Sequence, residues 1–325
     1  MAIGKRDSHR RSSGGLMMMK YGPLFVTEYI LLRMVGFLLT FLPYRLALSL
    51  GWLIGAFNFF VVRYRVAEAY RRIEQVFPEK YNAREKRRIA WHSFRGFSFS
   101  VVDLFRLDRI DQQWVDRHFV DFEPVRDTIQ AHCETGKGAI IASPHMGATE
   151  VSSVLMQHIG VPIFLITGTV KNPLVNDYLA EMRGRTGIPT VQRGSSMLRS
   201  VVSGLKKGGV LAFLADLRSR RGGTIIQFLD HTVAAAPGMA KFAKQTNVPI
   251  LPLIIRRVGW TRHKAVFSEP VVPDPNINKT DDCVRMTQEV FDVMERAIRE
   301  TPEQWFWFNK RWILDPPKPA GPIPT

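Results

Sequence analysis

Two histidines in this sequence each stand five residues before a glutamate, a combination that can form a catalytic pair. His145 precedes Glu150 in "HMGATE", and His118 precedes Glu123 in "HFVDFE". Near neutral pH an imidazole can take a proton from a hydroxyl group. A carboxylate on its second ring nitrogen fixes the tautomer and stabilises the imidazolium that forms. Spacing alone does not separate the two pairs, so the surrounding elements must decide.

The elements around His145 favour the first pair. The apolar run "GAIIAS" predicts a buried strand, and "ATEVSSVLMQHIG" predicts a helix. His145 then lies in the turn at the carboxyl end of a strand, where open α/β sheets bind ligands. Residues five apart within one helix point about 140° away from each other. The pair therefore meets only if His145 precedes the helix and Glu150 reaches back from its first turn, a turn that Gly147 permits. His118 and Glu123 lack this context, and we expect a structural or surface role for them.

Short apolar runs alternate with helical patterns through the second half of the chain. This alternation predicts an α/β fold with a mixed central sheet flanked by helices. The expected strands are 137–143, 161–167, 209–216, 224–229, 248–257 and 263–272. The expected helices are 148–159, 174–186, 196–207, 237–246 and about 280–300.

The amino-terminal part differs from the rest in composition. Residues 1–22 are basic and rich in Ser, Gly and Met, which predicts a disordered tail. From residue 23 to 66 the chain is apolar and aromatic, and its longest uncharged run, Leu46 to Val62, is close to the length that spans a bilayer. Arginines flank this run on both sides and fix no orientation. We expect a membrane-associated helical segment that either spans the bilayer or lies in its surface, with a buried core helix as the alternative.

Composition narrows the classes of partner. The chain has 325 residues, 46% of them hydrophobic, and a net charge of +16. This balance suits a globular protein with an acidic partner: nucleic acid, an anionic membrane, an acidic carrier protein or a phosphorylated substrate. The sequence contains no nucleic-acid-binding motif, so we expect no nucleic acid partner. Cys133 and Cys283 have no metal-ligand spacing, and no metal site or cofactor is expected.

Several stretches resemble, in order and spacing, the lipid A biosynthesis lauroyl/myristoyl acyltransferases. "PHMGATE" is similar to the histidine–acid motif that this family shares with lysophospholipid acyltransferases. The resemblance covers nearly the whole chain after about residue 25, and "PEQWFWFNKRW" is its most specific part. The other similar stretches are "RRIEQVFPE" (71–79), "KNPLVNDYLAEMRGRTG" (171–187), "LKKGGVLAFLAD" (205–216) and "IIQFLDHTVAAAPGMAKFAKQTNVPILPLIIRR" (225–257).

The resemblance implies a bacterial inner-membrane enzyme with a glycerophospholipid-acyltransferase-like core on the cytoplasmic side. It would transfer a fatty acyl chain, without an acyl-enzyme, from acyl carrier protein or coenzyme A to a hydroxyl of a glycolipid. His145 would be the general base and Glu150 its orienting partner. Arg183 or Arg185 would match the family's arginine near the thioester or a substrate phosphate. Asp216 would match the aspartate that follows a core strand.

Some residues depart from the family pattern or extend it. Pro144 and Thr149 replace the usual Asn and aromatic residue around the histidine motif, Arg72 replaces an Asn, and Asn309 replaces a histidine. These changes concern the choice of acceptor more than the reaction. Arg218 belongs to a group of basic residues that would suit a sugar phosphate or an acidic carrier protein. The aromatic run "QWFWF" predicts an apolar strand or an edge near the membrane.

The expected organisation is therefore a tail (1–22), a membrane anchor or interfacial helices (23–66), an acyltransferase domain (67–315) and a proline-rich tail (316–325). The main alternative is a non-catalytic, membrane-anchored protein that binds anionic lipid or a polyanion through its basic face. That protein would need the charge and the anchor, but neither His145 nor Glu150.

Overall fold

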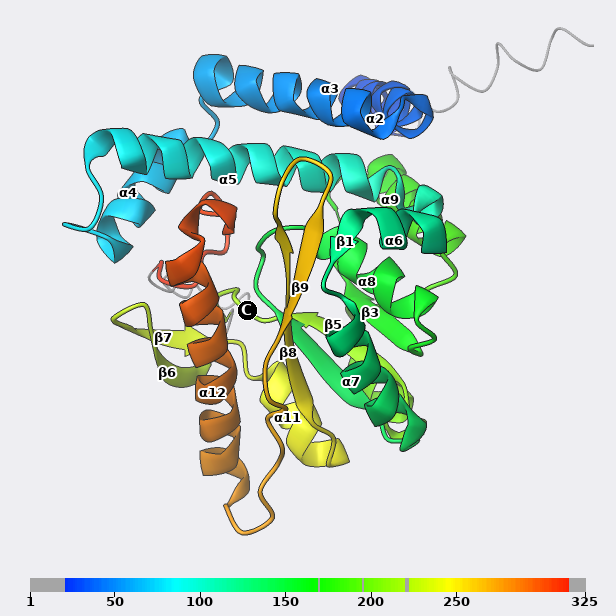
Figure 1. Ribbon diagram of the computed structural model, residues 1–325, viewed down its shortest axis with the longest axis vertical. Coiled ribbons are helices and arrows are strands. Elements are labelled where there is room, and N and C mark those ends of the chain that lie inside the picture. Colours follow the sequence, from blue (N-terminus) through cyan, green and yellow to red (C-terminus); the bar gives the residue numbers. More distant parts are fainter. Residues whose placement is uncertain (1–20, 169, 195, 220–221, 316–325) are drawn as a thin grey trace, which may run out of the picture.

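The structure is a computed structural model that describes residues 21–168, 170–194, 196–219 and 222–315. The carboxyl-terminal tail expected at 316–325, and all but the last two residues of the tail expected at 1–22, lie outside these ranges. The rest forms a three-layer α/β arrangement with two apolar helices along one side (Figure 1).

The centre of the molecule is a mixed sheet, as the sequence predicts. Within the described residues it has seven strands in the order β1-β9-β8-β2-β5-β3-β4, and its pairs are parallel except for β8 with β9. A separate antiparallel hairpin joins β6 (Thr224–Phe228) to β7 (His231–Ala235). The sheet strands are β1 (Phe119–Val120), β2 (Ala139–Ser143), β3 (Ile163–Thr167), β4 (Thr190–Gln192), β5 (Val210–Leu214), β8 (Ile250–Arg257) and β9 (His263–Phe267).

Side chains of β2 alternate between two apolar layers. Ile140 and Ala142 belong to the layer that includes α11 and α12, whereas Ala139 and Ile141 belong to the layer that includes α7 and α8. All four are buried, which explains why the strand reads as a continuous apolar run. The helices of these layers are α4 (Val66–Val76), α6 (Gln112–His118), α7 (Glu123–Glu134), α8 (Thr149–His158), α10 (Met197–Lys206), α11 (Gly238–Thr246) and α12 (Lys279–Glu300). Helix α9 (Pro173–Arg185) contributes Tyr178 and Met182 to a third apolar cluster, with the amino-terminal helices.

Helix α5 (Ala83–Leu104) connects the sheet to the amino-terminal helices (Figure 1). It begins with a capping box in which Asn82 and Glu85 exchange hydrogen bonds. On one side Ser100 Oγ donates to the carbonyl of Gly147, in the turn after β2, at 2.9 Å. On the other side α5 packs closely against α3 (Tyr44–Phe57), where a Cβ on Gly55 would lie 2.5 Å from Ser98 Oγ. Helix α5 thus fixes the apolar helices relative to the end of β2.

The segment expected to contact a membrane forms α2 (Pro23–Phe41), α3 (Tyr44–Phe57) and a π-helical turn, η1 (Asn58–Val62). By length and composition, Pro23–Phe41 and Tyr44–Val62 could each cross a bilayer, and only 17% and 33% of the two stretches are buried. Phe37, Phe41 and Val61 are each more than 60% exposed. A core helix would be covered, so the exposed apolar surface favours contact with lipid over the buried-helix alternative.

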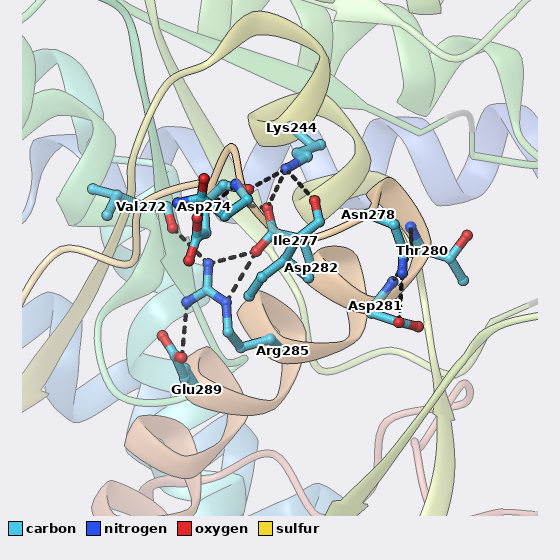
Figure 2. Close-up of polar contacts among 11 residues, drawn as sticks. Lys244, Val272, Asp274, Ile277, Asn278, Thr280, Asp281, Asp282, Arg285 and Glu289 are labelled. Atoms are coloured by element: carbon cyan, nitrogen blue, oxygen red, sulfur yellow. Dashed lines mark hydrogen bonds and ion pairs between the residues drawn. The ribbon is translucent and has the colours of Figure 1, made fainter.

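A cluster of polar contacts ties α12 to α11 at the far end of the sheet (Figure 2). Asp282 is fully buried and pairs with Lys244 at 2.8 Å and with Arg285 at 2.6 Å. Lys244 also donates to the carbonyls of Asp274 and Ile277, which closes the loop before α12. Burial alone would raise the pKa of Asp282, but the hydrogen bonds from Lys244 and Arg285 hold it below its ordinary value.

We expect Asp282→Asn to destabilise the fold by about 2 kcal/mol, because it leaves two cations without their buried partner. The folded-state pKa lies below the unfolded value, so this contribution is complete above about pH 4 and is lost as the pH falls through the folded-state pKa. Denaturant unfolding in detergent, followed by circular dichroism, should show a gap between parent and variant that narrows only in acid. Asp281→Asn, on the same turn but exposed, is the matched control. An equal loss in both variants would contradict the ion-pair explanation.

Candidate active site

His145 lies where the sequence predicts it, in the turn between β2 and α8. Its side chain is 20% exposed. Nδ1 lies 2.6 Å from Asp216 Oδ1, and the backbone N–H of His145 donates to Asp216 Oδ2 at 2.8 Å. No described residue forms a hydrogen bond with Nε2. The imidazole is thus held through Nδ1 and its backbone, and Nε2 is open to a further contact.

Asp216 reaches His145 because of the register of two parallel strands. Ser143, the last residue of β2, pairs with Leu214, the last residue of β5. His145 and Asp216 each follow two residues later, so their side chains leave the same edge of the sheet side by side.

The carboxylate of Asp216 is buried and polarised by its neighbours. Burial alone would raise its pKa. The charge of His145 and the hydrogen bonds from His145 and Trp305 outweigh burial and lower the pKa. The ionised carboxylate can only accept hydrogen bonds, so Nδ1 of His145 must donate, and Nε2 is the basic nitrogen of the neutral ring.

Trp305, in the segment after the short 3-10 helix η3 (Pro302–Gln304), completes this cluster. It is buried, and its Nε1 donates to Asp216 Oδ2 at 2.7 Å. The neighbouring backbone holds the turn: Phe306 N donates to the carbonyl of His145, and Gly147 N donates to that of Gln304. The aromatic run was expected to be a strand or a membrane edge. The expectation of a strand is wrong, because Trp305 lies in an irregular buried segment with only an isolated bridge to the turn after β2.

Glu150 does not occupy the position expected for the orienting carboxylate. It lies in the first turn of α8, half-buried, with Oε1 3.9 Å from Arg183 Nη2. No hydrogen bond joins it to His145 in the described part of the chain. Burial raises the pKa of Glu150, while the charges of Arg183 and His145 oppose the shift. The structure therefore brings His145, Asp216, Glu150 and Arg183 into one region but gives Nδ1 to Asp216.

Two other expected substrate-binding residues have partners that do not include His145 or Asp216. Arg185 is half exposed and pairs with Glu181 one turn earlier in α9, at 2.8 Å. Arg218 is half-buried, and its backbone N–H and its side chain bond carbonyls of the carboxyl-terminal segment. His118 stacks on Trp114 and bonds its carbonyl, which agrees with the structural role expected for it.

The departures from the family pattern include one residue with a clear structural role. Arg72 is buried and donates to the carbonyls of Trp307 and Asn309, and its second amino group pairs with Asp315 at 2.6 Å. Its guanidinium also lies over the ring of Trp312. Arg72 thus fixes the segment that carries Trp305. Pro144 is buried beside His145, and Thr149 is the first residue of α8.

We expect Trp305→Phe to reduce turnover by about tenfold, because the smaller ring keeps the packing but removes the donor that fixes Asp216. The loss should fall on kcat and leave KM almost unchanged. Steady-state kinetics of the acyl transfer that the sequence resemblance implies would show the split. Trp307→Phe removes an indole donor to the Pro302 carbonyl instead and serves as the control. Equal effects of both variants would mean that Trp305 acts through packing alone.

Comparisons with known proteins match most of the chain to acyltransferases. Residues 23–313 match a family model described as bacterial lipid A biosynthesis acyltransferase. The chain is 22% identical over 281 residues to the lipid A biosynthesis palmitoleoyltransferase of Escherichia coli (strain K12), covering 85% of this chain and 87% of the relative. It is 23% identical over 283 residues to that strain's lipid A biosynthesis lauroyltransferase, covering 85% and 88%. A phosphatidylinositol mannoside acyltransferase of Mycolicibacterium smegmatis is 22% identical over 195 residues, covering 58% and 61%.

Proposed function

Since the chain belongs to the bacterial lipid A biosynthesis acyltransferase family, we propose that it moves a fatty acyl chain from an acyl thioester to a hydroxyl of a lipid A precursor or a related glycolipid. The donor would be acyl carrier protein or coenzyme A. The observation that carries the proposal is His145 at the carboxyl edge of the sheet, fixed on Asp216 through Nδ1, with no described residue bound to Nε2.

In this proposal Nε2 of His145 takes the proton of the acceptor hydroxyl as its oxygen attacks the thioester carbon. Asp216 holds the ring and stabilises the imidazolium by accepting from Nδ1. The tetrahedral intermediate then expels the thiolate, which takes the proton from Nε2. The products are an ester and a free thiol. The transfer is direct, so no side chain of the protein carries the acyl group.

The negative charge that develops on the carbonyl oxygen of the thioester must be stabilised by hydrogen-bond donors. The N–H groups of Thr149 and Glu150, at the start of α8, have no partner among the described residues and can supply them, and Arg183 adds a positive charge nearby. We assign Glu150 to holding Arg183, since the two side chains lie 3.9 Å apart. Glu150 and Arg183 then act on the acyl or phosphate group of a substrate, whereas Asp216 acts on the imidazole.

The apolar helices suit a glycolipid acceptor that stays in its membrane. Helices α2 and α3 expose Phe37, Phe41 and Leu46, and α5 links them to the turn that carries His145. A protein seated on the bilayer through these helices can receive a lipid hydroxyl without extracting the acyl chains. We place the enzyme on the cytoplasmic side of the inner membrane, where acyl thioesters are made.

The test is acyl transfer by membranes that carry either the parent protein or His145→Ala. Each is supplied with a lipid A precursor and with acyl carrier protein or coenzyme A thioesters in separate reactions. Mass spectrometry should show an acylated glycolipid with the parent and a loss of about 10³-fold or more with the variant. If the parent and the variant both bind lipid but neither forms product with either thioester, the non-catalytic lipid-binding protein would instead be favoured. A trapped acyl group on a Ser or Cys would contradict direct transfer.

A further inference from the structure

A basic cavity lies where the apolar helices meet the start of α5. It has a volume of about 480 Å³ and is lined by Phe60, Trp91, Glu85 and three arginines, Arg84, Arg87 and Arg88. The end of α3 and the first turns of α5 lie side by side in Figure 1, and in η1, which follows α3, Phe59 contacts Trp91 of α5. The cavity is separate from the reaction site. Arg88 stands twelve residues before Ser100, about 18 Å along the helix from the contact with Gly147.

The arginines of this cavity have no acidic partner in the described part of the chain. Arg84, Arg87 and Arg88 are exposed, and none forms an ion pair with any described residue. Glu85, the only acid in the lining, is already engaged, because its carboxylate accepts the N–H of Asn82 at 2.8 Å. Three cations side by side repel one another, so they favour an anion between them.

Neighbouring groups respond to this positive field. Burial, together with the charges of Arg95 and Arg88, lowers the pKa of His92 to about 4. The charges of Arg87 and Arg63 oppose the increase that burial causes in the pKa of Tyr70. Arg63, at the end of η1, therefore adds to the same field.

The other wall of the cavity is aromatic and continues into the apolar helices. Phe60 and Trp91 pack with ring centroids 5.2 Å apart, and Trp91 also meets Trp52 at 5.8 Å. Arg87 lies over the ring of Phe60. Phe60 and Trp52 are 49% and 38% exposed, beside Val61 and Val62. Aromatic rings next to arginines, at the border of an apolar surface, are typical of the level of lipid headgroups.

We propose that this cavity binds the phosphate of an anionic membrane lipid, whose acyl chains extend along the exposed face of α3 and η1. Arg84, Arg87 and Arg88 hold the phosphate, and Phe60 and Trp91 support the adjoining glycerol region. The contact fixes how the protein sits on the bilayer, at a point away from His145. The proposal is independent of the acyl-transfer reaction.

The test measures binding of the purified full-length protein to vesicles of phosphatidylcholine alone, or of phosphatidylcholine with one-fifth phosphatidylglycerol. The pocket variant combines Arg84→Gln, Arg87→Gln and Arg88→Gln. Its matched control combines Lys137→Gln, Lys206→Gln and Lys207→Gln. These lysines are exposed at the amino ends of β2 and β5, opposite to α5, and their loss removes the same charge.

We expect the pocket variant to bind the anionic vesicles on the order of 10- to 100-fold more weakly than the parent. Binding to pure phosphatidylcholine should be unchanged, and the control should stay within about threefold of the parent. A variant with lysine at the three arginine positions should keep most of the affinity, which separates charge from misfolding. Equal losses in the pocket variant and the control would overturn the proposal, because net charge would explain them. Unchanged vesicle binding with weaker binding of an acidic carrier protein would overturn it too, and would assign the surface to protein docking.

Discussion

Asp216→Asn is expected to lower kcat for acyl transfer by about 10³- to 10⁴-fold while the protein stays folded. An asparagine has the size of the aspartate, but its amide can donate as well as accept. The imidazole can then adopt the tautomer that places the proton on Nε2, where a base is needed. Asp216 acts through His145 and is a positioning residue. The loss should therefore fall on kcat, with KM changed by less than about threefold.

Glu150→Gln is the matched comparison, since it also exchanges an acid for its amide within the same region. We expect a smaller loss, about 10- to 100-fold, with an increase in KM for the substrate that Arg183 is proposed to bind. Arg183→Lys should resemble it, because both changes disturb the same pair. If Glu150→Gln abolishes turnover and Asp216→Asn leaves it near normal, the roles of the two carboxylates are the reverse of those proposed here.

Gly147→Ala is expected to reduce activity by about 100-fold or more and to destabilise the protein by about 2 kcal/mol or more. Gly147 has a φ of +63°, and a Cβ there would lie 2.0 Å from the carbonyl oxygen of Ile255. That oxygen accepts the N–H of Ala148, so the backbone of the turn and of β8 must separate. The turn that carries His145 would move with it. Kinetics and thermal unfolding of the same preparation would measure both effects.

Gly160→Ala is the control for this variant. Gly160 also has a positive φ, +82°, but a Cβ there meets no atom within 4 Å. The substitution carries the cost of the left-handed backbone alone, about 1–2 kcal/mol. It lies at the opposite end of α8 and should leave kcat unchanged. If both glycine variants lose activity equally, the clash with Ile255 is not the cause.

Much of the fold follows from local patterns in the sequence. Strands β2, β3, β5 and β8 are short apolar runs bounded by turn residues. In the helices between them, apolar residues recur at helical spacing. Strands β1, β4 and β7 were missed. The first two have two and three residues, and β7 ("HTVAA") has little apolar pattern. Their pairing depends on neighbours distant in the chain.

The choice between Glu150 and Asp216 could not be made from the histidine motif. Glu150 is near His145 in sequence, but the first turn of α8 directs its side chain toward Arg183. Asp216 is 71 residues away, and only the register of β2 with β5 brings it to Nδ1. The sequence holds a usable signal. In "IIASPH" and in "LAFLAD" a polar residue, His145 or Asp216, stands two positions after the end of an apolar strand. Comparing strand ends in this way would have paired His145 with Asp216.

Trp305 carried no such signal. Its role depends on the carboxyl-terminal segment passing under α5, where Ser93 Oγ donates to its carbonyl and Arg72 holds the residues that follow. Each of these contacts joins positions more than 200 residues apart in the sequence. A run of aromatic residues is compatible with a strand, a membrane edge or a buried irregular segment, and only the packed structure distinguishes these possibilities.

The central claim is that Asp216 holds the proton of His145 on Nδ1. Nitrogen-15 NMR of histidine-labelled protein in detergent tests it directly, with His145→Ala used to assign the signal. When the ring of His145 is neutral, the parent and Glu150→Gln should show a protonated Nδ1 and an unprotonated Nε2, and Asp216→Asn should lose this pattern. A pattern that survives Asp216→Asn but changes in Glu150→Gln would contradict the account.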